Sequence, residues 1–253
     1  MLDRLFISNG LLLLSVISPF ALKAAANTDF INEIPDFTQS QITGWEHRNG
    51  SQYCGPVAVS NSLYWLAGMT GSPENLIKLL ASSRYMNTDV RKGTRTTQML
   101  NGIHAMATDM FGGYGSLEYQ GWKLHPSRFS AGTMVPDFHW ITQELSQDAA
   151  VWLNVGWYRY DREENLYHRV GGHWVTLVGY DRNVLIIHDP APRAGQSFAN
   201  EYVHTSVIKS GTLAGRLAGL PRSAEGYLLL GNGMHIKSTA DVAIVDGAIR
   251  LKL

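Results

Sequence analysis

The sequence SQYCGPVAVSNSLYWL at residues 51–66 decides the fold, because it joins the single cysteine of the chain to a long apolar segment. Gly55 and Pro56 follow Cys54 at once, and proline is tolerated in the first turn of a helix, where its missing N–H would have no partner. No helix breaker then occurs before Gly68, and the apolar residues point to more than one side. We therefore predict a buried helix that begins at or just after Cys54.

A thiol at the N-terminus of a buried helix has two interpretations. The unpaired N–H groups and the positive end of the helix dipole stabilise a thiolate, which is what a nucleophilic cysteine needs. A cysteine is also a small apolar residue that fills a gap in a core. Residues 51–66 alone leave both interpretations open.

Composition excludes several classes of function. Lys+Arg and Asp+Glu both number 21, so the chain lacks the charge surplus of a protein that binds nucleic acid or an anionic membrane. A metal cluster cannot be built around one thiol, and the sequence holds no His-Glu-x-x-His motif. We expect no metal, no cofactor and no nucleic-acid partner.

Residues 1–26 have the pattern of a cleaved signal peptide. Arg4 gives a weakly basic start, residues 11–22 are largely apolar, and three alanines stand at residues 24–26. The apolar run is short for a membrane span and is interrupted by serine and proline, although an uncleaved anchor is an alternative. We expect residues 27–253 to form a single exported domain, secreted or periplasmic, without stable membrane association. In such a compartment a lone thiol is kept for its chemistry or for an intermolecular disulfide.

Apolar spacing predicts further helices in the first half of the chain. One starts at Ser72-Pro73, a second follows the stripe from Met99 to Met110 and ends at Gly112, and a short third starts at Pro136-Asp137. A strand is expected at residues 118–122.

The second half favours strands. Residues 149–157 form one β-rich run, and residues 173–180 and 184–189 read as a β-hairpin around a polar turn. Residues 159–169 are polar and charged, which indicates a loop.

Beyond Pro190 the chain looks like a loop to about Arg222. Residues 227–230 are expected to return as a strand, and Asp246-Gly247 is a hairpin-turn signal inside residues 243–249. Helices first and strands second predict an α+β fold with an antiparallel sheet.

The ends of the predicted hairpin carry the second candidate feature. His173 begins its first strand and Asp189 ends its second, so the antiparallel pairing can make them neighbours. A carboxylate that accepts from one imidazole nitrogen leaves the other nitrogen for a nucleophile, and a thiol in that position completes a Cys-His-Asp triad. The plain alternatives are a structural histidine and a turn aspartate.

Three sequence blocks resemble those of papain-like cysteine peptidases. They are Tyr53-Cys54-Gly55-Pro56-Val57-Ala58, Gly172-His173-Trp174-Val175 and His188-Asp189-Pro190, and the branch that they resemble most contains the bacteriocin-processing, double-glycine leader peptidases. The resemblance implies a papain-like fold with the cysteine on a buried central helix packed against an antiparallel sheet that carries the other two residues. It further implies Cys54 as nucleophile, His173 as general base and acid, and Asp189 as the group that orients His173.

The chain departs from this family in one motif. The family usually carries a glutamine about six positions before the cysteine, whose amide helps to form the oxyanion hole, but position 48 is Arg48. The nearest candidate is Gln52, and Gln41 is an alternative. The Cys54 N–H is the expected second donor.

These observations lead to one main hypothesis and two alternatives. The first is an exported thiol hydrolase that cuts a peptide or related amide in a peptide or protein substrate, through a thioester acyl-enzyme. The second passes the same acyl group to an amine or thiol, as in the peptidyl-transfer branch typified by phytochelatin synthases, which the Tyr-Cys-Gly start also resembles. The third is a catalytically idle papain-like domain used for binding.

Overall fold

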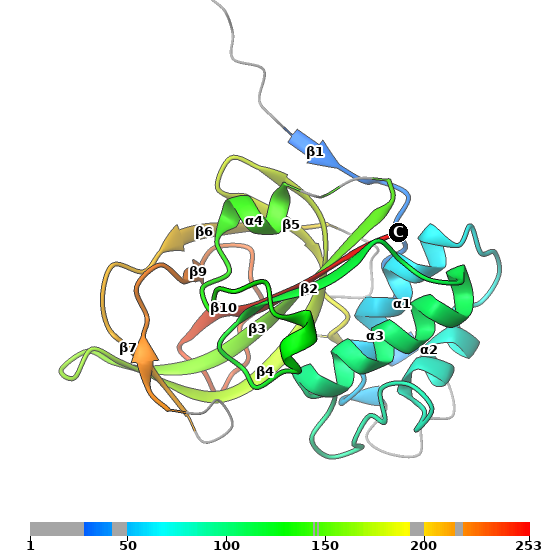
Figure 1. The fold of residues 1–253 in the computed structure, drawn as a ribbon. Helices are drawn as coiled ribbons and strands as arrows, with labels where there is room; N and C mark the ends of the chain where they lie inside the picture. Colours follow the sequence, from blue (N-terminus) through cyan, green and yellow to red (C-terminus); the bar gives the residue numbers. More distant parts are fainter. Residues whose placement is uncertain (1–27, 42–49, 144, 146, 193–199, 216–219) are drawn as a thin grey trace, which may run out of the picture.

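The computed structural model describes residues 28–41, 50–143, 145, 147–192, 200–215 and 220–253, and the predicted signal peptide lies outside them. Helices α1 to α3 gather on one side of the molecule, and a curved sheet forms the other (Figure 1). Within the described ranges, no helix has the length and apolar character needed to cross a bilayer.

The helical side follows the apolar pattern of the sequence. Its main element is α1 (Cys54–Leu66), buried from Gly55 to Tyr64, which confirms the predicted central helix. The remaining helical segments are α2 (Glu74–Ala81), α3 (Thr96–Phe111), which ends at Gly112 with φ of 73°, α4 (Phe138–Thr142), and the 3-10 turns η1 (Gln39–Gln41) and η3 (Ser127–Phe129). The Asp137 side chain caps α4 by accepting from the Trp140 N–H at 2.8 Å.

Six antiparallel strands close into a barrel. Around the barrel they run β3 (Ala149–Asp161), β4 (Leu166–Asp181), β5 (Val184–His188), β6 (Glu201–Val207), β9 (Leu228–Leu230) and β10 (Val242–Lys252), which pairs again with β3. Further strands extend it: β2 (Ser116–Gly121) along β10, β1 (Thr28–Phe30) and β7 (Thr212–Ala214) along β4, and β8 (Arg222–Ser223) along β7. The β4–β7 pair is parallel, so the sheet is antiparallel with one exception.

Alternation along the strands separates two cores. Val151, Leu153 and Val155 of β3 belong to a cluster with the inward residues of the other barrel strands. Trp152 and Trp174 face the opposite way and pack among the residues of α1 and α3. The Trp152 Nε1 donates to the Ala58 carbonyl at 3.0 Å, which fixes α1 against the barrel.

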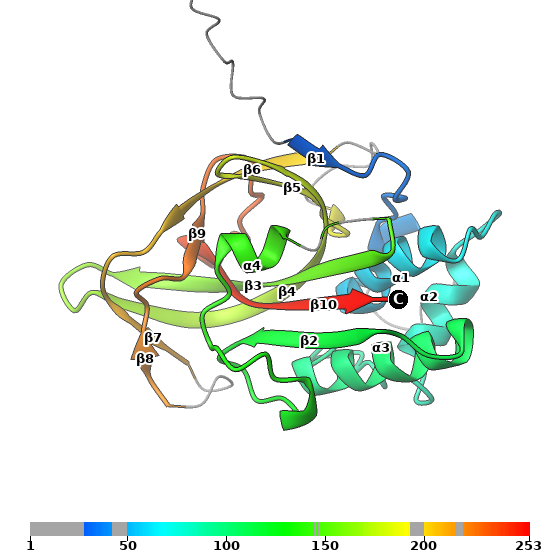
Figure 2. The same ribbon diagram turned by 45° about the horizontal axis from the view of Figure 1, so that its top comes forward.

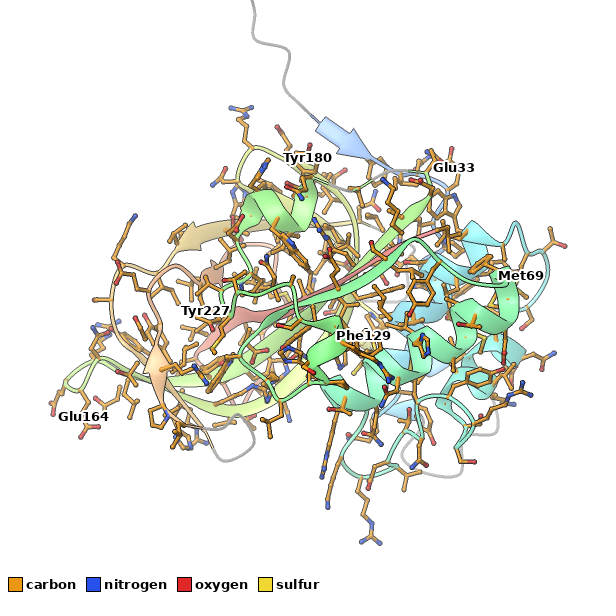
Figure 3. The ribbon with its side chains drawn as sticks, in the orientation of Figure 1. Glu33, Met69, Phe129, Glu164, Tyr180 and Tyr227 are labelled. Carbon is orange, nitrogen blue, oxygen red and sulfur yellow. The ribbon has the colours of Figure 1, made fainter. Side chains whose placement is uncertain are left out.

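Two predicted loops are wrong. Residues 159–169 continue β3 and β4 as a long hairpin with Glu164 at its tip (Figure 3), because Tyr160 and Tyr167 stack across the strands at 4.4 Å. Residues 190–222 contain β6, β7 and the first residue of β8. In β6 only alternate residues such as Val203 are buried, so the polar outward residues hide the strand in the sequence.

The predicted hairpin turn at Asp246-Gly247 is also wrong. Strand β10 runs straight through it, and the register against β3 shifts between Val245 and Gly247, which is a β-bulge. The bulge accommodates Asp246, whose carboxylate pairs with Arg169 at 2.5 Å. The Asp246-Gly247 pair, which is typical of turns, therefore forms a bulge here that buries a charged side chain.

Candidate active site

Cys54 is the first residue of α1 and is half-buried. Cys54 follows directly after a turn at residues 50–53. In this turn the Tyr53 N–H donates to the Gly50 carbonyl at 2.9 Å, and Gly50 has φ of 78°. Gly55 lets the residues just before α3 pack close to the start of α1, because a Cβ atom at position 55 would lie 3.0 Å from the Thr94 side chain. The thiol consequently lies at the free N-terminus of a buried helix, where the helix dipole favours a negative charge.

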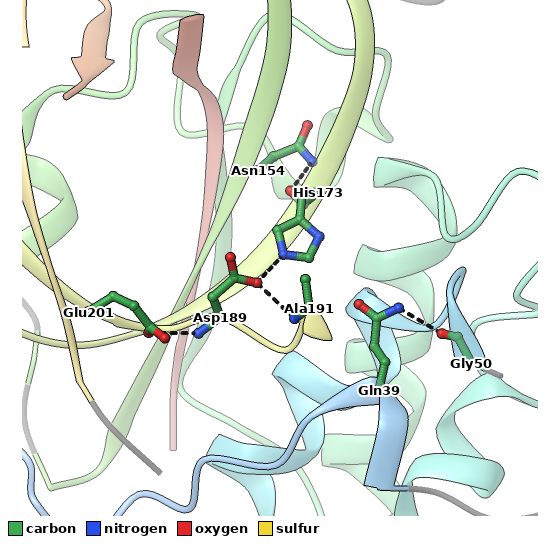
Figure 4. A network of polar contacts seen from close by, with 7 residues as sticks. All are labelled: Gln39, Gly50, Asn154, His173, Asp189, Ala191 and Glu201. Carbon is green, nitrogen blue, oxygen red and sulfur yellow. Dashed lines mark hydrogen bonds and ion pairs between the residues drawn. The ribbon is translucent and has the colours of Figure 1, made fainter. Parts of the chain in front are cut away.

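His173 and Asp189 form a buried pair on the barrel. The His173 Nε2 lies 2.5 Å from the Asp189 Oδ1, which also accepts from the Ala191 N–H at 2.8 Å (Figure 4). The imidazole stacks on Trp157 at 5.9 Å, and the Asn154 Nδ2 donates to the His173 carbonyl at 3.2 Å. These contacts hold the ring in one orientation and leave Nδ1 for another partner.

The electrostatics link this pair to the thiol. Burial lowers the pKa of His173, but the Asp189 carboxylate and then the Cys54 sulfur outweigh it and raise the pKa to about 9. Burial raises the pKa of Cys54, but a hydrogen bond and the positive charge of His173, together with the Trp174 backbone, leave that pKa below its ordinary value. Both shifts favour a thiolate beside an imidazolium.

Of the neighbours His188 and Asp189, the aspartate faces His173. His188 instead contacts the Pro35 carbonyl through Nδ1 at 3.1 Å and the Asn200 Oδ1 through Nε2 at 2.8 Å. This follows from the alternation of side chains along a strand.

The structure brings Gln39 close to the site, a residue that the sequence analysis did not single out. Gln39 is buried, and its Nε2 donates to the Gly50 carbonyl at 2.7 Å (Figure 4). Its backbone N–H donates to the Pro190 carbonyl at 2.7 Å. It therefore ties the turn before Cys54 to the residue after Asp189. The predicted donor Gln52 is half-buried beside Gly93. The side chain of Gln41 lies outside the described part of the structure.

Glu201 and Asn154 were also missed by sequence reasoning. The Glu201 Oε2 accepts from the Asp189 N–H at 3.1 Å (Figure 4). The signal for Asn154 was present, since it is the one polar residue in the apolar run of residues 149–157. Glu201 gave no such signal, because an exposed-looking β strand contains it.

We predict that Glu201 makes stability depend on pH. Burial first, and then the carboxylates of Asp36 and Asp189, raise the pKa of Glu201 to about 8. The folded state thus favours the protonated form, and the stability that this proton confers is lost as the pH rises through about 8. The melting temperature of Glu201→Gln relative to wild type should increase from pH 5 to pH 9. The exposed Glu225→Gln is the control, and parallel melting profiles for wild type and Glu201→Gln would contradict the prediction.

Comparison with known proteins identifies a family and several similar solved structures. The model of the Peptidase_C39 like family matches residues 31–210. The crystal structure of a candidate C39-like peptidase from Bacillus anthracis is similar with a TM-score of 0.43 and 12% sequence identity, covering 89% of this chain and 98% of that one. The chain matches none of the curated proteins.

Proposed function

Because the chain belongs to the Peptidase_C39 like family, we propose that it is a cysteine hydrolase that cleaves a peptide or related amide bond. The observation that carries the proposal is the His173–Asp189 pair, which is electrostatically coupled to the thiol at the start of α1. Cys54 is the nucleophile, His173 the acid and base, and Asp189 the group that orients the imidazole. We also propose, from residues 1–26, that it acts outside the cytoplasm.

The reaction follows from the charges of the site. The Cys54 thiolate attacks the amide carbonyl carbon, and the electron pair of the C=O bond moves to oxygen. When the C–N bond breaks, the His173 imidazolium gives its proton to the leaving amine. His173, now neutral, takes a proton from water, which opens the thioester and releases a carboxylic acid. Asp189 keeps the Nε2–H in place throughout, so that Nδ1 does the proton transfer.

A peptide library analysed by mass spectrometry tests this proposal. Wild type should cleave a subset of peptides, and Cys54→Ala should cleave none. An added amine or thiol separates hydrolysis from acyl transfer, because a transferase forms the conjugate at the expense of the acid product. If no peptide, thioester or activated amide acylates wild type, the domain is a binding module rather than an enzyme.

We predict that one glutamine completes the oxyanion hole together with the Cys54 N–H. Removing one such donor lowers turnover by ~10²–10³-fold. We expect this loss for Gln39→Ala, because Gln39 is buried between the turn that delivers Cys54 and Pro190. The same loss in Gln52→Ala alone would assign the role to Gln52, as the sequence predicts. Alkylation of Cys54 should be unchanged in both variants, which separates an oxyanion role from damage to the thiol.

A further inference from the structure

The face of the barrel in front of α1 can be located from contacts along β4. The Thr176 Oγ1 donates to the Ala58 carbonyl at 2.8 Å, and the Cys54 thiol is hydrogen-bonded to the Trp174 backbone. Helix α1 therefore runs along β4. Its first residue, Cys54, lies against Trp174, and its second turn lies against Thr176. Gly172 is the next residue on the same face, it lies beyond the helix N-terminus, and it is exposed, so we infer that a substrate held against Cys54 passes in front of it.

A row of glycines makes room on this face. Gly121 of β2 pairs with Gly247 of β10, and Gly156 of β3 pairs with Gly172 of β4. These four strands lie side by side (Figure 2). A side chain at any of the four positions would collide with a polar group that lies over the row, and at Gly172 that group is the Nη2 of Arg169. The sequence thus leaves space for a guanidinium beside the strand that carries His173.

The charged side chains near the glycine row, Arg169, Lys123 and Asp246, carry a net positive charge. The Arg169 Nε donates to the Asp246 Oδ2 at 2.5 Å, which neutralises one charge. The terminal Nη2 of Arg169 lies over Gly172, which is exposed. Lys123, half-buried just after β2, adds a second cation close enough to Arg169 to be repelled by it. Two cations therefore face one carboxylate.

We propose that Arg169 and Lys123 form a subsite that binds a carboxylate of the substrate, so that the enzyme favours acidic peptides. The guanidinium fork matches the two oxygens of a carboxylate, and a partly desolvated cation pair is relieved by an anion. Gly172 lies two residues from Trp174, or ~7 Å along the strand, so the acidic group falls about two residues from the scissile bond. The inference rests on the proposed function, because it names the substrate of the same site.

Lys123 gives the subsite a pH dependence. Burial and then the Arg169 charge lower the pKa of Lys123 to about 8, although Asp246 opposes this shift. The groups that face it are Arg169 of β4 and Asp246 of β10, and the Tyr119 and Tyr158 hydroxyls lie beside Asp246 with pKa values raised by burial. The preference for acidic substrates should therefore decrease as the pH rises through about 8, while Arg169 retains its charge.

The test uses pairs of capped hexapeptides that differ only by Glu or Gln, with the residue placed at each position in turn. At one position wild type should give a kcat/KM at least ~10-fold higher for Glu, the value of one favourable charged contact. Lys123→Gln and Arg169→Lys should each reduce this ratio several-fold, and Lys78→Gln, an exposed lysine of α2, should not. A peptide with a free C-terminus and no acidic side chain tests whether the carboxylate comes from the chain end instead.

Each outcome decides the inference. A Glu/Gln ratio near one at every position, with no preference for the free C-terminus, would overturn it, as would a preference that both variants retain. If wild type cleaves no peptide, binding of the same peptides to Cys54→Ala is measured by calorimetry. Tighter binding of an acidic peptide that Lys123→Gln abolishes supports the subsite even though the hydrolase proposal has failed, and equal binding of the Glu and Gln peptides overturns it.

Discussion

Replacing His173 with alanine should abolish hydrolysis and slow the alkylation of Cys54 at pH 6, because an ordinary thiol with a pKa of ~8.5 is less than 1% ionised there. In wild type, burial raises the pKa of the thiol, but the hydrogen bond and the charge of His173 outweigh it and lower the pKa, so a larger fraction of the thiol is ionised at that pH. Loss of a triad base lowers turnover by up to ~10⁶-fold. The measurement is the rate of iodoacetamide labelling against pH, with peptide hydrolysis followed in parallel.

The alkaline side of the pH profile provides the control. His173 has its pKa raised to about 9, mainly by Asp189 against the effect of burial, so wild-type activity should fall above pH 9 as the imidazolium loses its proton. In Asp189→Asn this fall should move to lower pH, because the carboxylate that stabilises the imidazolium is gone. Equal alkylation rates in wild type and His173→Ala at pH 6 would show that no thiolate–imidazolium pair exists.

The elements predicted best from sequence were those whose apolar pattern is local. The buried helix from Cys54 and the pairing of residues 173–180 with 184–189 can be read from spacing and turn residues alone, and the structure contains both. The same pairing brings His173 to Asp189, which is why a separation of 16 residues did not conceal that contact. Their catalytic role remains a proposal.

The barrel could not be predicted, because its closure depends on residues whose sequence pattern is typical of loops and turns. Strand β6 buries only one side, and β10 contains Asp246-Gly247, whose bulge is explained only by the partner Arg169, 77 positions away. Gln39 was hidden for a similar reason, since what marks it are contacts with Gly50 and Pro190. Long-range polar contacts of this kind leave no periodic signal in the sequence.

Asp246→Asn should destabilise the protein by ~3–5 kcal/mol, the cost of breaking a buried ion pair by removing one partner. Asp246 is fully buried, and it accepts from Arg169 and from the Tyr158 hydroxyl at 3.1 Å. The variant leaves the guanidinium in the barrel wall without its counter-charge. Urea unfolding measures the change, and Asp109→Asn, which breaks the exposed pair with Arg84, should leave the free energy of unfolding nearly unchanged.

A double variant separates the charge from the packing. Arg169→Met combined with Asp246→Leu removes both charges and keeps similar volumes, and such replacements of buried pairs are often neutral or stabilising. We expect the double variant to recover most of the stability lost in Asp246→Asn and yet to lose the preference for acidic peptides. A double variant as unstable as Asp246→Asn would show that the bulge, and not the charge pair, requires Asp246. Recovery of stability without the acidic preference would mean that the ion pair is retained for substrate recognition and not for folding.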